Sequence, residues 1–324
     1  MRLVNTTLLL LGLLTLMPAA GAQDFELETD GDRLAEAIDS GSVAAVRRLL
    51  DSGVSANTLV YDSPPLQWAI WDEKYYVVKL LIDRGADVNL PDEDGYTSLM
   101  CACDMSSKRI VDLLLDKGAD INAVELLYGM SALQSACSAG DEAIVDLLLE
   151  RGADINHIDK YSGNCLEEAA YYGHKAVVEK LKAKGLKSDY PLHIACGIGD
   201  VEEVKKQLAA GKKADQPNEG WKNTPLHFAS GGGHLEIIKL LVENGANVNA
   251  KNVLGTTLLH EAASADHLEL VKWLVAQGAD INAKDEEGST PLDWSSGESA
   301  TYLEEIGAEY GEYDDFEPEG DVSI

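Results

Sequence analysis

The sequence repeats itself with a period close to 33 residues. Residues 223–249 read NTPLHFASGGGHLEIIKLLVENGANVN, and residues 256–282 read TTLLHEAASADHLELVKWLVAQGADIN. In each copy an alanine follows a leading leucine by three residues, a Val or Ile lies nine residues further on, and a Gly sixteen residues further on. The eight anchor alanines are Ala37, Ala69, Ala102, Ala136, Ala169, Ala195, Ala229 and Ala262. A period of this length predicts a stack of supersecondary units.

Each unit has the pattern of two short helices. Thr or Ser before Pro-Leu, as at Thr224, supplies an N-cap with proline at the first helical position. The V-x-x-L-L segment begins a second, amphipathic helix, and the glycine after it can adopt the left-handed conformation that ends a helix. One such pair cannot bury its own apolar face, so we expect the units to stack.

These motifs resemble the ankyrin-repeat family, whose TPLH-x-A signature is complete at residues 224–229. The resemblance covers residues 31–308 and implies an all-α solenoid of stacked helix-turn-helix units with short hairpin fingers. We expect repeats 1–5 over residues 31–186, and repeats 6–8 with a truncated C-terminal cap repeat over residues 187–308. In the cap repeat we expect the second helix to be cut short.

One interval departs from the period. Ala169 and Ala195 lie 26 residues apart, so seven residues are absent before Tyr190. Because the sequence KGLKSDYPLH runs almost directly from one unit into the next, the absent residues belong to a finger. We expect a missing finger at this point and regard a bend in the stack as one consequence.

The N-terminus begins MRLVNTTLLLLGLLTLMPAAGAQ, with Arg2 as its only charge. A leucine-rich run followed by small residues predicts a secretory signal peptide over residues 1–22, then a linker over residues 23–30. An uncleaved membrane anchor is the alternative, but the apolar run is shorter than the roughly 20 residues that a span needs. We expect an exported protein, in the periplasm or cell envelope rather than fully secreted, because unpaired thiols suit a shielded compartment.

The chain is strongly acidic. It has 26 Lys and Arg against 56 Asp and Glu, a net charge of −30 at pH 7, and removal of residues 1–22 would take away only Arg2. Such a surface repels nucleic acid and anionic lipid, and it attracts cationic partners at long range. Solubility alone is the simpler explanation. Residues 309–324 form an acidic tail that we expect to be disordered, either a solubilising tail or an arm that competes for a basic partner.

The stretch YPLHIACGIGD at residues 190–200 places His193 and Cys196 on one helix face. This spacing suits a nucleophile with its base, or half a metal site. However, six of the seven histidines occupy repeat positions, and packed helix layers lie about 8–10 Å apart. Since zinc ligands must each lie about 2 Å from the metal, we expect histidines that hydrogen-bond between units, and no metal.

The five cysteines share no CxxC spacing, and a disulfide needs Cα atoms within about 7 Å. We therefore expect five free thiols. The chain has no GxSxG, HExxH, P-loop or dinucleotide-binding turn. Residues 231–233, Gly-Gly-Gly, resemble a phosphate cradle but lie in the turn between two repeat helices. We expect no enzyme and no cofactor.

Function is therefore expected in a surface. The resemblance implies that the fingers and the exposed face of each first helix form a concave binding surface. Many residues at these positions are aromatic or large and apolar, as in interface hot spots. The predicted partner-binding residues are Tyr61, Trp71, Asp72, Tyr96, Met105, Leu126, Leu127, Tyr128, Tyr161, Tyr171, Tyr172 and Trp221. Ile198 is also expected to face outward. The alternative is that some of these side chains cover neighbouring fingers.

The sequence thus favours a monomeric, exported binding protein that contacts another protein with a basic or aromatic surface. One alternative is an inhibitor or immunity protein that masks such a surface on a toxin or enzyme. A second is a scaffold that assembles envelope proteins, and an enzyme is the remaining one.

Overall fold

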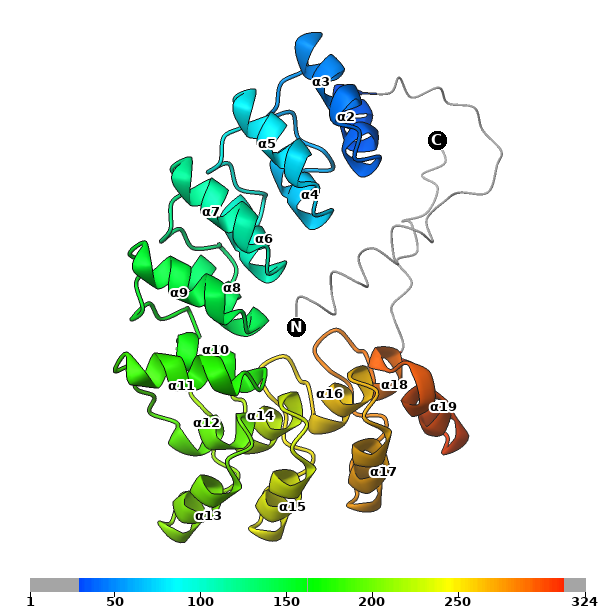
Figure 1. Ribbon diagram of the computed structural model, residues 1–324. Coiled ribbons are helices and arrows are strands. Elements are labelled where there is room, and N and C mark those ends of the chain that lie inside the picture. The colour runs from blue at the N-terminus through cyan, green and yellow to red at the C-terminus, as the bar shows by residue number, and fades with distance from the viewer. Residues whose placement is uncertain (1–28, 162, 312–324) are drawn as a thin grey trace, which may run out of the picture.

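The computed structural model describes residues 29–161 and 163–311, so the predicted signal peptide and most of the acidic tail lie outside it. Within these ranges the chain forms nine helix pairs and no strand (Figure 1), which confirms the expected all-α solenoid. The inner helices are α2 (Asp30–Asp39), α4 (Pro65–Trp71), α6 (Ser98–Asp104), α8 (Ala132–Ala139), α10 (Cys165–Tyr171), α12 (Pro191–Gly197), α14 (Pro225–Gly231), α16 (Leu258–Ser264) and α18 (Pro291–Trp294). The outer helices are α3 (Val43–Asp51), α5 (Tyr75–Asp83), α7 (Lys108–Asp116), α9 (Glu142–Glu150), α11 (Lys175–Ala183), α13 (Val201–Ala209), α15 (Leu235–Glu243), α17 (Leu268–Ala276) and α19 (Gly297–Glu305).

Local sequence sets the ends of these helices. At α6 the Thr97 hydroxyl accepts a hydrogen bond from the Met100 amide at 3.3 Å, which satisfies one of the amides that a helix start leaves free. At the other end of the unit, Gly118 follows α7 with a φ of 87°, a left-handed conformation that glycine adopts without steric cost.

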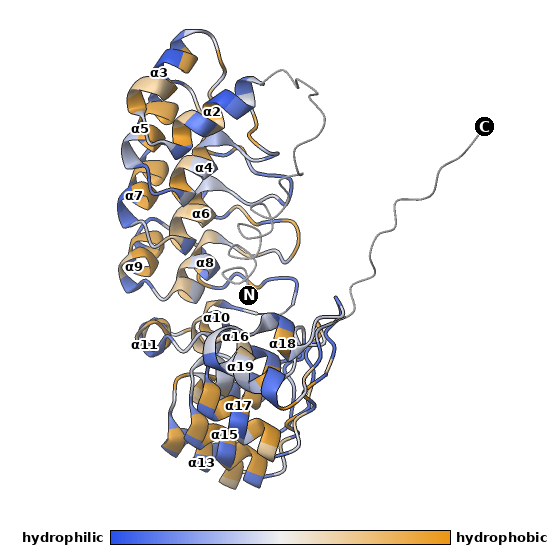
Figure 2. Cartoon of the chain, turned by 90° about the vertical axis from the view of Figure 1, so that its right-hand side faces the viewer, coloured by the Kyte–Doolittle hydropathy of each residue, from blue (hydrophilic) through white to orange (hydrophobic). Residues whose placement is uncertain are grey.

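The stack shares one hydrophobic core. Every anchor alanine is buried, because the inner helices of successive units approach one another through this small side chain. On α7, Ile110, Val111 and Leu114 are buried while Lys108 and Arg109 are exposed, the one-sided burial of an amphipathic helix. The periodic apolar positions of the sequence therefore become a continuous core along the solenoid (Figure 2).

Several fingers are each organised by one polar side chain. In the finger before α10, Oδ1 of Asp159 accepts hydrogen bonds from the amides of Tyr161 and Gly163, both at 2.8 Å. The finger before α8 has one extra residue, and there the longer Glu125 takes this role, accepting from the amides of Leu127, Tyr128 and Met130. Neighbouring fingers are joined by backbone hydrogen bonds, such as Lys160 amide to Tyr128 carbonyl at 2.8 Å.

The C-terminal cap repeat differs from the expectation. Its second helix, α19, has nine residues, as long as α17, so the predicted shortening of that helix is wrong. The shortened element is the first helix, α18, with four residues. It stops at Ser295, whose backbone is extended and which replaces the anchor alanine of the other units, a better helix former than serine. Residues 309–311, assigned to the acidic tail, are hydrogen-bonded to this repeat, as in the Glu309 amide to Asn282 at 2.9 Å.

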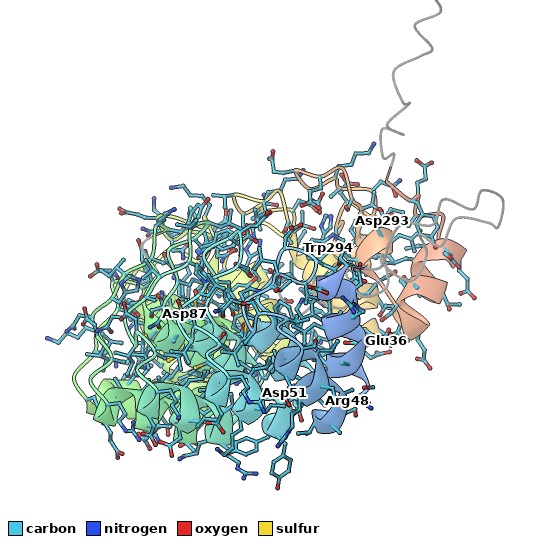
Figure 3. The ribbon with its side chains drawn as sticks, turned by 90° about the horizontal axis from the view of Figure 1, so that it is seen from above. Glu36, Arg48, Asp51, Asp87, Asp293 and Trp294 are labelled. Atoms are coloured by element: carbon cyan, nitrogen blue, oxygen red, sulfur yellow. The ribbon has the colours of Figure 1, made fainter. Side chains whose placement is uncertain are left out.

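The stack turns sharply at its sixth unit. Only residues 184–190 separate α11 from α12, whereas residues 210–224 separate α13 from α14. With no finger in the way, α10 contacts α14 as well as α12. Figure 1 shows the units from α2 to α11 stacked from top to bottom, and the units from α12 to α19 turning to run across the bottom of the view, below the open side of the curve. In the view from above, Glu36 on α2 and Trp294 on α18 overlap (Figure 3), although Figure 1 shows their helices at opposite ends of the solenoid.

Candidate functional site

Aromatic side chains from three fingers meet at the bend. The rings of Tyr161 and Trp221 stack with centroids 4.2 Å apart and planes inclined by 24°, and Tyr128 lies 5.2 Å from Trp221. Gly220 permits this contact, because a Cβ there would lie 1.6 Å from the carbonyl oxygen of Tyr161. The finger of the seventh repeat thus occupies the place left by the missing finger of the sixth.

Glycines bring the inner helices equally close. A Cβ on Gly197, at the end of α12, would lie 2.0 Å from the carbonyl oxygen of Ala170 on α10. A Cβ on Gly231, at the end of α14, would lie 2.0 Å from the carbonyl oxygen of Tyr171. Gly232 faces the carbonyl oxygen of Gly197 in the same way, at 2.4 Å. The glycine run at residues 231–233 is therefore a packing surface, and its likeness to a phosphate cradle is superficial.

Tyr171 ties the two arms of the solenoid together. Its hydroxyl, on α10, donates a hydrogen bond to Oε1 of Glu261 on α16 at 2.5 Å. Its ring packs edge-on against Phe228 of α14, with centroids 5.4 Å apart. The hydrogen bond from Tyr171 to Glu261 thus joins residues ninety positions apart in the chain.

These contacts enclose a groove, which we call the bend groove, with a volume of about 730 Å³. It lies between the inner helices and the fingers of the third to ninth repeats. Nine Asp or Glu residues and seven aromatic residues line it, and no lysine, arginine or histidine does so among the residues that the structure describes. Its size falls in the range typical of ligand sites, and its chemistry is acidic and aromatic.

The carboxylates of the bend groove have different roles. Glu125 holds a finger, and Oδ2 of Asp293 accepts hydrogen bonds from Thr290 and from the Gly311 amide. Asp285 accepts from the Glu287 and Ser289 amides. No described residue donates a hydrogen bond to the side-chain carboxyl of Glu168 on α10, and the carboxyl of Glu261 accepts only that of Tyr171. Glu168 and Glu261 are thus the carboxylates with capacity to spare.

Buried polar atoms without partners also line the bend groove. Oγ of Ser230 and Oδ1 of Asn218 belong to residues that are 3% and 6% exposed, and neither atom is hydrogen-bonded within the described chain. Oε2 of Glu261 is also buried and makes no hydrogen bond within the described chain. Leaving such groups unsatisfied costs roughly 1–3 kcal/mol each. The groove therefore holds hydrogen-bonding capacity that a ligand could use.

Burial raises the pKa of both spare carboxyls. Loss of hydration raises the pKa of Glu168 to about 8, and the negative charge of Asp159 adds to the effect. Loss of hydration likewise raises the pKa of Glu261 to about 8. The hydrogen bond from Tyr171 lowers this pKa but does not offset the loss of hydration. No cation among the described groove residues offsets this cost.

The predicted partner-binding residues fall into two groups. Tyr128, Tyr171, Tyr172 and Trp221 line the bend groove, and Tyr161 stacks behind Trp221. The others lie on the fingers or at the ends of α4 and α6: Tyr61, Leu126 and Leu127 are exposed, and Trp71, Asp72 and Met105 are half-buried. Tyr61, 67% exposed, meets Trp68 edge-on, and Trp68 meets Trp71 in the same way.

Two of the expected surface residues are buried. Tyr96 is 7% exposed, because its finger folds its ring over the inner helices and its hydroxyl donates to Asp104. Ile198 is 8% exposed, because the bend packs α12 between α10 and α14. Tyr96 still contributes to the wall of the bend groove, whereas Ile198 does not.

The histidines are structural. Nε2 of His227 and of His260 each hydrogen-bond a carbonyl of the next unit at 3.2 Å, those of Thr256 and Ser289. His193 lacks the usual cap bond because Tyr190 stands where threonine is usual. Burial lowers the pKa of His193 to about 4.

The cysteines do not form a reactive site. All five are buried and free, and burial raises the pKa of the Cys196 thiol well above its usual value. His193 and Cys196 are thus packing residues. Among the described residues no cluster of three potential ligands could hold a metal ion. No described helix is both long and apolar enough to span a bilayer.

This architecture defines a helical-repeat protein whose units present a concave surface built from fingers and inner helices. The chain belongs to the ankyrin-repeat family: the family model described as ankyrin repeats (3 copies) matches residues 34–125, 123–191, 166–252, 192–285 and 251–314. Ankyrin repeats are protein-interaction modules, and the fold is typically a non-enzymatic scaffold.

Curated relatives share the repeats over part of their length. Ankyrin repeat and SOCS box protein 11 of Homo sapiens is 35% identical over 97 residues, 28% of this chain and 29% of that protein. E3 ubiquitin-protein ligase XBAT33 of Arabidopsis thaliana is 47% identical over 60 residues, 18% of this chain and 12% of that protein. Probable E3 ubiquitin-protein ligase XBOS32 of Oryza sativa subsp. japonica is 27% identical over 249 residues, 72% of this chain and 42% of that protein. The matched region is less than half of each relative.

Proposed function

We propose that this protein binds a partner protein in the bend groove and that the bound surface of the partner is basic. The observation that carries the proposal is the lining of the groove, which combines nine carboxylates with seven aromatic residues and includes no base among the described residues. Aromatic side chains supply contact area at low entropic cost, and acidic side chains select cationic partners and steer their approach.

The distribution of bases supports this choice. Lysines and arginines that form ion pairs lie mostly on the outer helices and the turns after them, for example Lys180 with Asp146 at 2.5 Å and Arg151 with Asp112 at 2.6 Å. The outer face is thus internally compensated, whereas the bend groove is not. A basic partner therefore gains most by entering the groove.

The N-terminal sequence supports export to the periplasm or cell envelope as part of the same proposal. An exported binder with an acidic groove would act as an inhibitor or immunity protein if it masks a basic surface of a toxin or enzyme. It would act as a scaffold if it holds two envelope proteins together. The bend groove favours masking, because residues from both arms of the solenoid line it.

A capture experiment tests the proposed surface. Purified protein lacking residues 1–22 is expected to retain a partner from an extract of the cell that makes it. The triple variant Tyr128→Ala/Tyr172→Ala/Trp221→Ala, at three groove residues, should lose at least about tenfold of that capture, since hot-spot aromatics each contribute about 1–2 kcal/mol or more. A matched variant on the outer face, Tyr75→Ala/Tyr76→Ala, should retain it. Equal capture by all three proteins would exclude the proposed surface.

A further inference from the structure

One part of the bend groove lies between the two arms of the solenoid. Glu168 and Tyr172 occupy successive turns of one face of α10 and its C-cap, and Glu261 faces them from α16 through its bond to Tyr171. Ser230 of α14 closes the side between them. We call these residues the acidic recess.

Resting on the proposed function, we infer that the acidic recess takes one positively charged side chain, a lysine or arginine, from the bound segment of the partner. Three independent features support this. Two carboxyls from different arms line the same groove, and no lysine, arginine or histidine among the described groove residues lies with them. Oε2 of Glu261 and Oγ of the 3% exposed Ser230 lack hydrogen bonds within the described chain and can accept them. Tyrosine rings beside them offer faces on which a cation stacks.

The chemistry of the recess discriminates by charge. A lysine or arginine has only hydrogen-bond donors at its tip, which matches a site whose spare atoms are oxygens. A neutral isostere would not compensate the carboxyls of the recess, and a carboxylate ligand would be repelled. The groove volume of about 730 Å³ leaves room for backbone on either side of the inserted side chain.

Short peptides test the recess directly. The probes are acetyl-Gly-Ala-Xaa-Ala-Gly-amide with arginine, lysine or citrulline at the central position, because citrulline keeps the shape of arginine without its charge. Binding is followed by the NMR shifts of the aromatic ring signals at constant ionic strength, up to peptide concentrations on the order of 10 mM. We expect saturable binding of the arginine or lysine peptide and at least about tenfold weaker binding of the citrulline peptide.

Two variants locate the binding. Glu168→Gln/Glu261→Gln removes two carboxyls that a bound cation would hold in the ionised form. The side-chain amide oxygen introduced on α16 can still accept the hydrogen bond from Tyr171, and this variant should weaken cationic binding at least about tenfold. Glu150→Gln/Glu243→Gln removes two exposed charges from the ends of α9 and α15 and should change it less than about twofold.

Each outcome bears on a different claim. Failure of both cationic peptides to bind, equal binding of citrulline, or full binding by Glu168→Gln/Glu261→Gln would overturn the acidic recess as a cation site. If that variant also captured the partner normally while the aromatic triple variant did not, the proposed function would stand without the recess. If both the glutamine variant and the aromatic triple variant captured the partner normally, the proposed function itself would be excluded.

Discussion

Replacing Gly197 by alanine is expected to lower the free energy of unfolding by at least about 2 kcal/mol, because its Cβ would lie 2.0 Å from the Ala170 carbonyl oxygen. That oxygen belongs to helix backbone and cannot move without shifting α10. The loss should appear although alanine favours a helix by about 1 kcal/mol over glycine. Urea denaturation followed by circular dichroism measures the change.

The sister position in the eighth repeat supplies the control. Ser264 ends α16 in the same register and already carries a Cβ, so Ser264→Ala should change stability by less than about 0.5 kcal/mol. Gly231→Ala should behave like Gly197→Ala, since its Cβ meets the Tyr171 carbonyl oxygen at 2.0 Å. Wild-type stability in both glycine variants would mean that the helices at the bend are not as close as the structure has them.

Replacing Glu168 or Glu261 by glutamine is expected to stabilise the protein, and more so at alkaline pH. Both carboxyls have a pKa near 4.5 in an unfolded chain and about 8 in the fold. As the pH rises, the unfolded chain releases its proton first, so the folded state loses relative stability from about pH 4.5 up to about pH 8. Glutamine does not titrate and avoids this loss.

At pH 8.5 we expect the free energy of unfolding to rise by about 1–3 kcal/mol per site. This is less than the full pKa shift would give at about 1.36 kcal/mol per unit, because both side chains are partly exposed to solvent. At pH 5 the gain should shrink below about 1 kcal/mol. Urea midpoints at the two pH values give the comparison, with exposed Glu150→Gln as the control. Variants no more stable than wild type at pH 8.5 would show that the two carboxyls are ordinarily hydrated.

The repeat period accounts for most of the fold. Anchor alanines, N-caps and terminal glycines act within one unit or between adjacent units, so their sequence spacing is sufficient to predict the stack. The interval of 26 residues before Ala195 also marks where the stack bends. The direction of the bend depends on the close approach of Gly197 and Gly231 to α10, which no single repeat reveals.

The sequence predicts only part of the candidate site. Tyr128, Tyr171, Tyr172 and Trp221 stand out because finger and turn positions are usually polar, and they do line the bend groove. Glu168 and Glu261 were missed because acids are common in this chain. A signal existed: both precede an anchor alanine, where the second, third, sixth and seventh units have Trp68, Cys101, Ile194 and Phe228. Only the bend brings the two glutamates onto one groove.

Photo-crosslinking in the cell that makes the protein tests the central claim most directly. A photo-reactive phenylalanine analogue replaces either Tyr172, in the bend groove, or Tyr76, which is 67% exposed on α5 of the outer face. A groove that binds a partner protein predicts a discrete crosslinked product from position 172 and none from position 76. A product from position 76 with none from position 172 would contradict it.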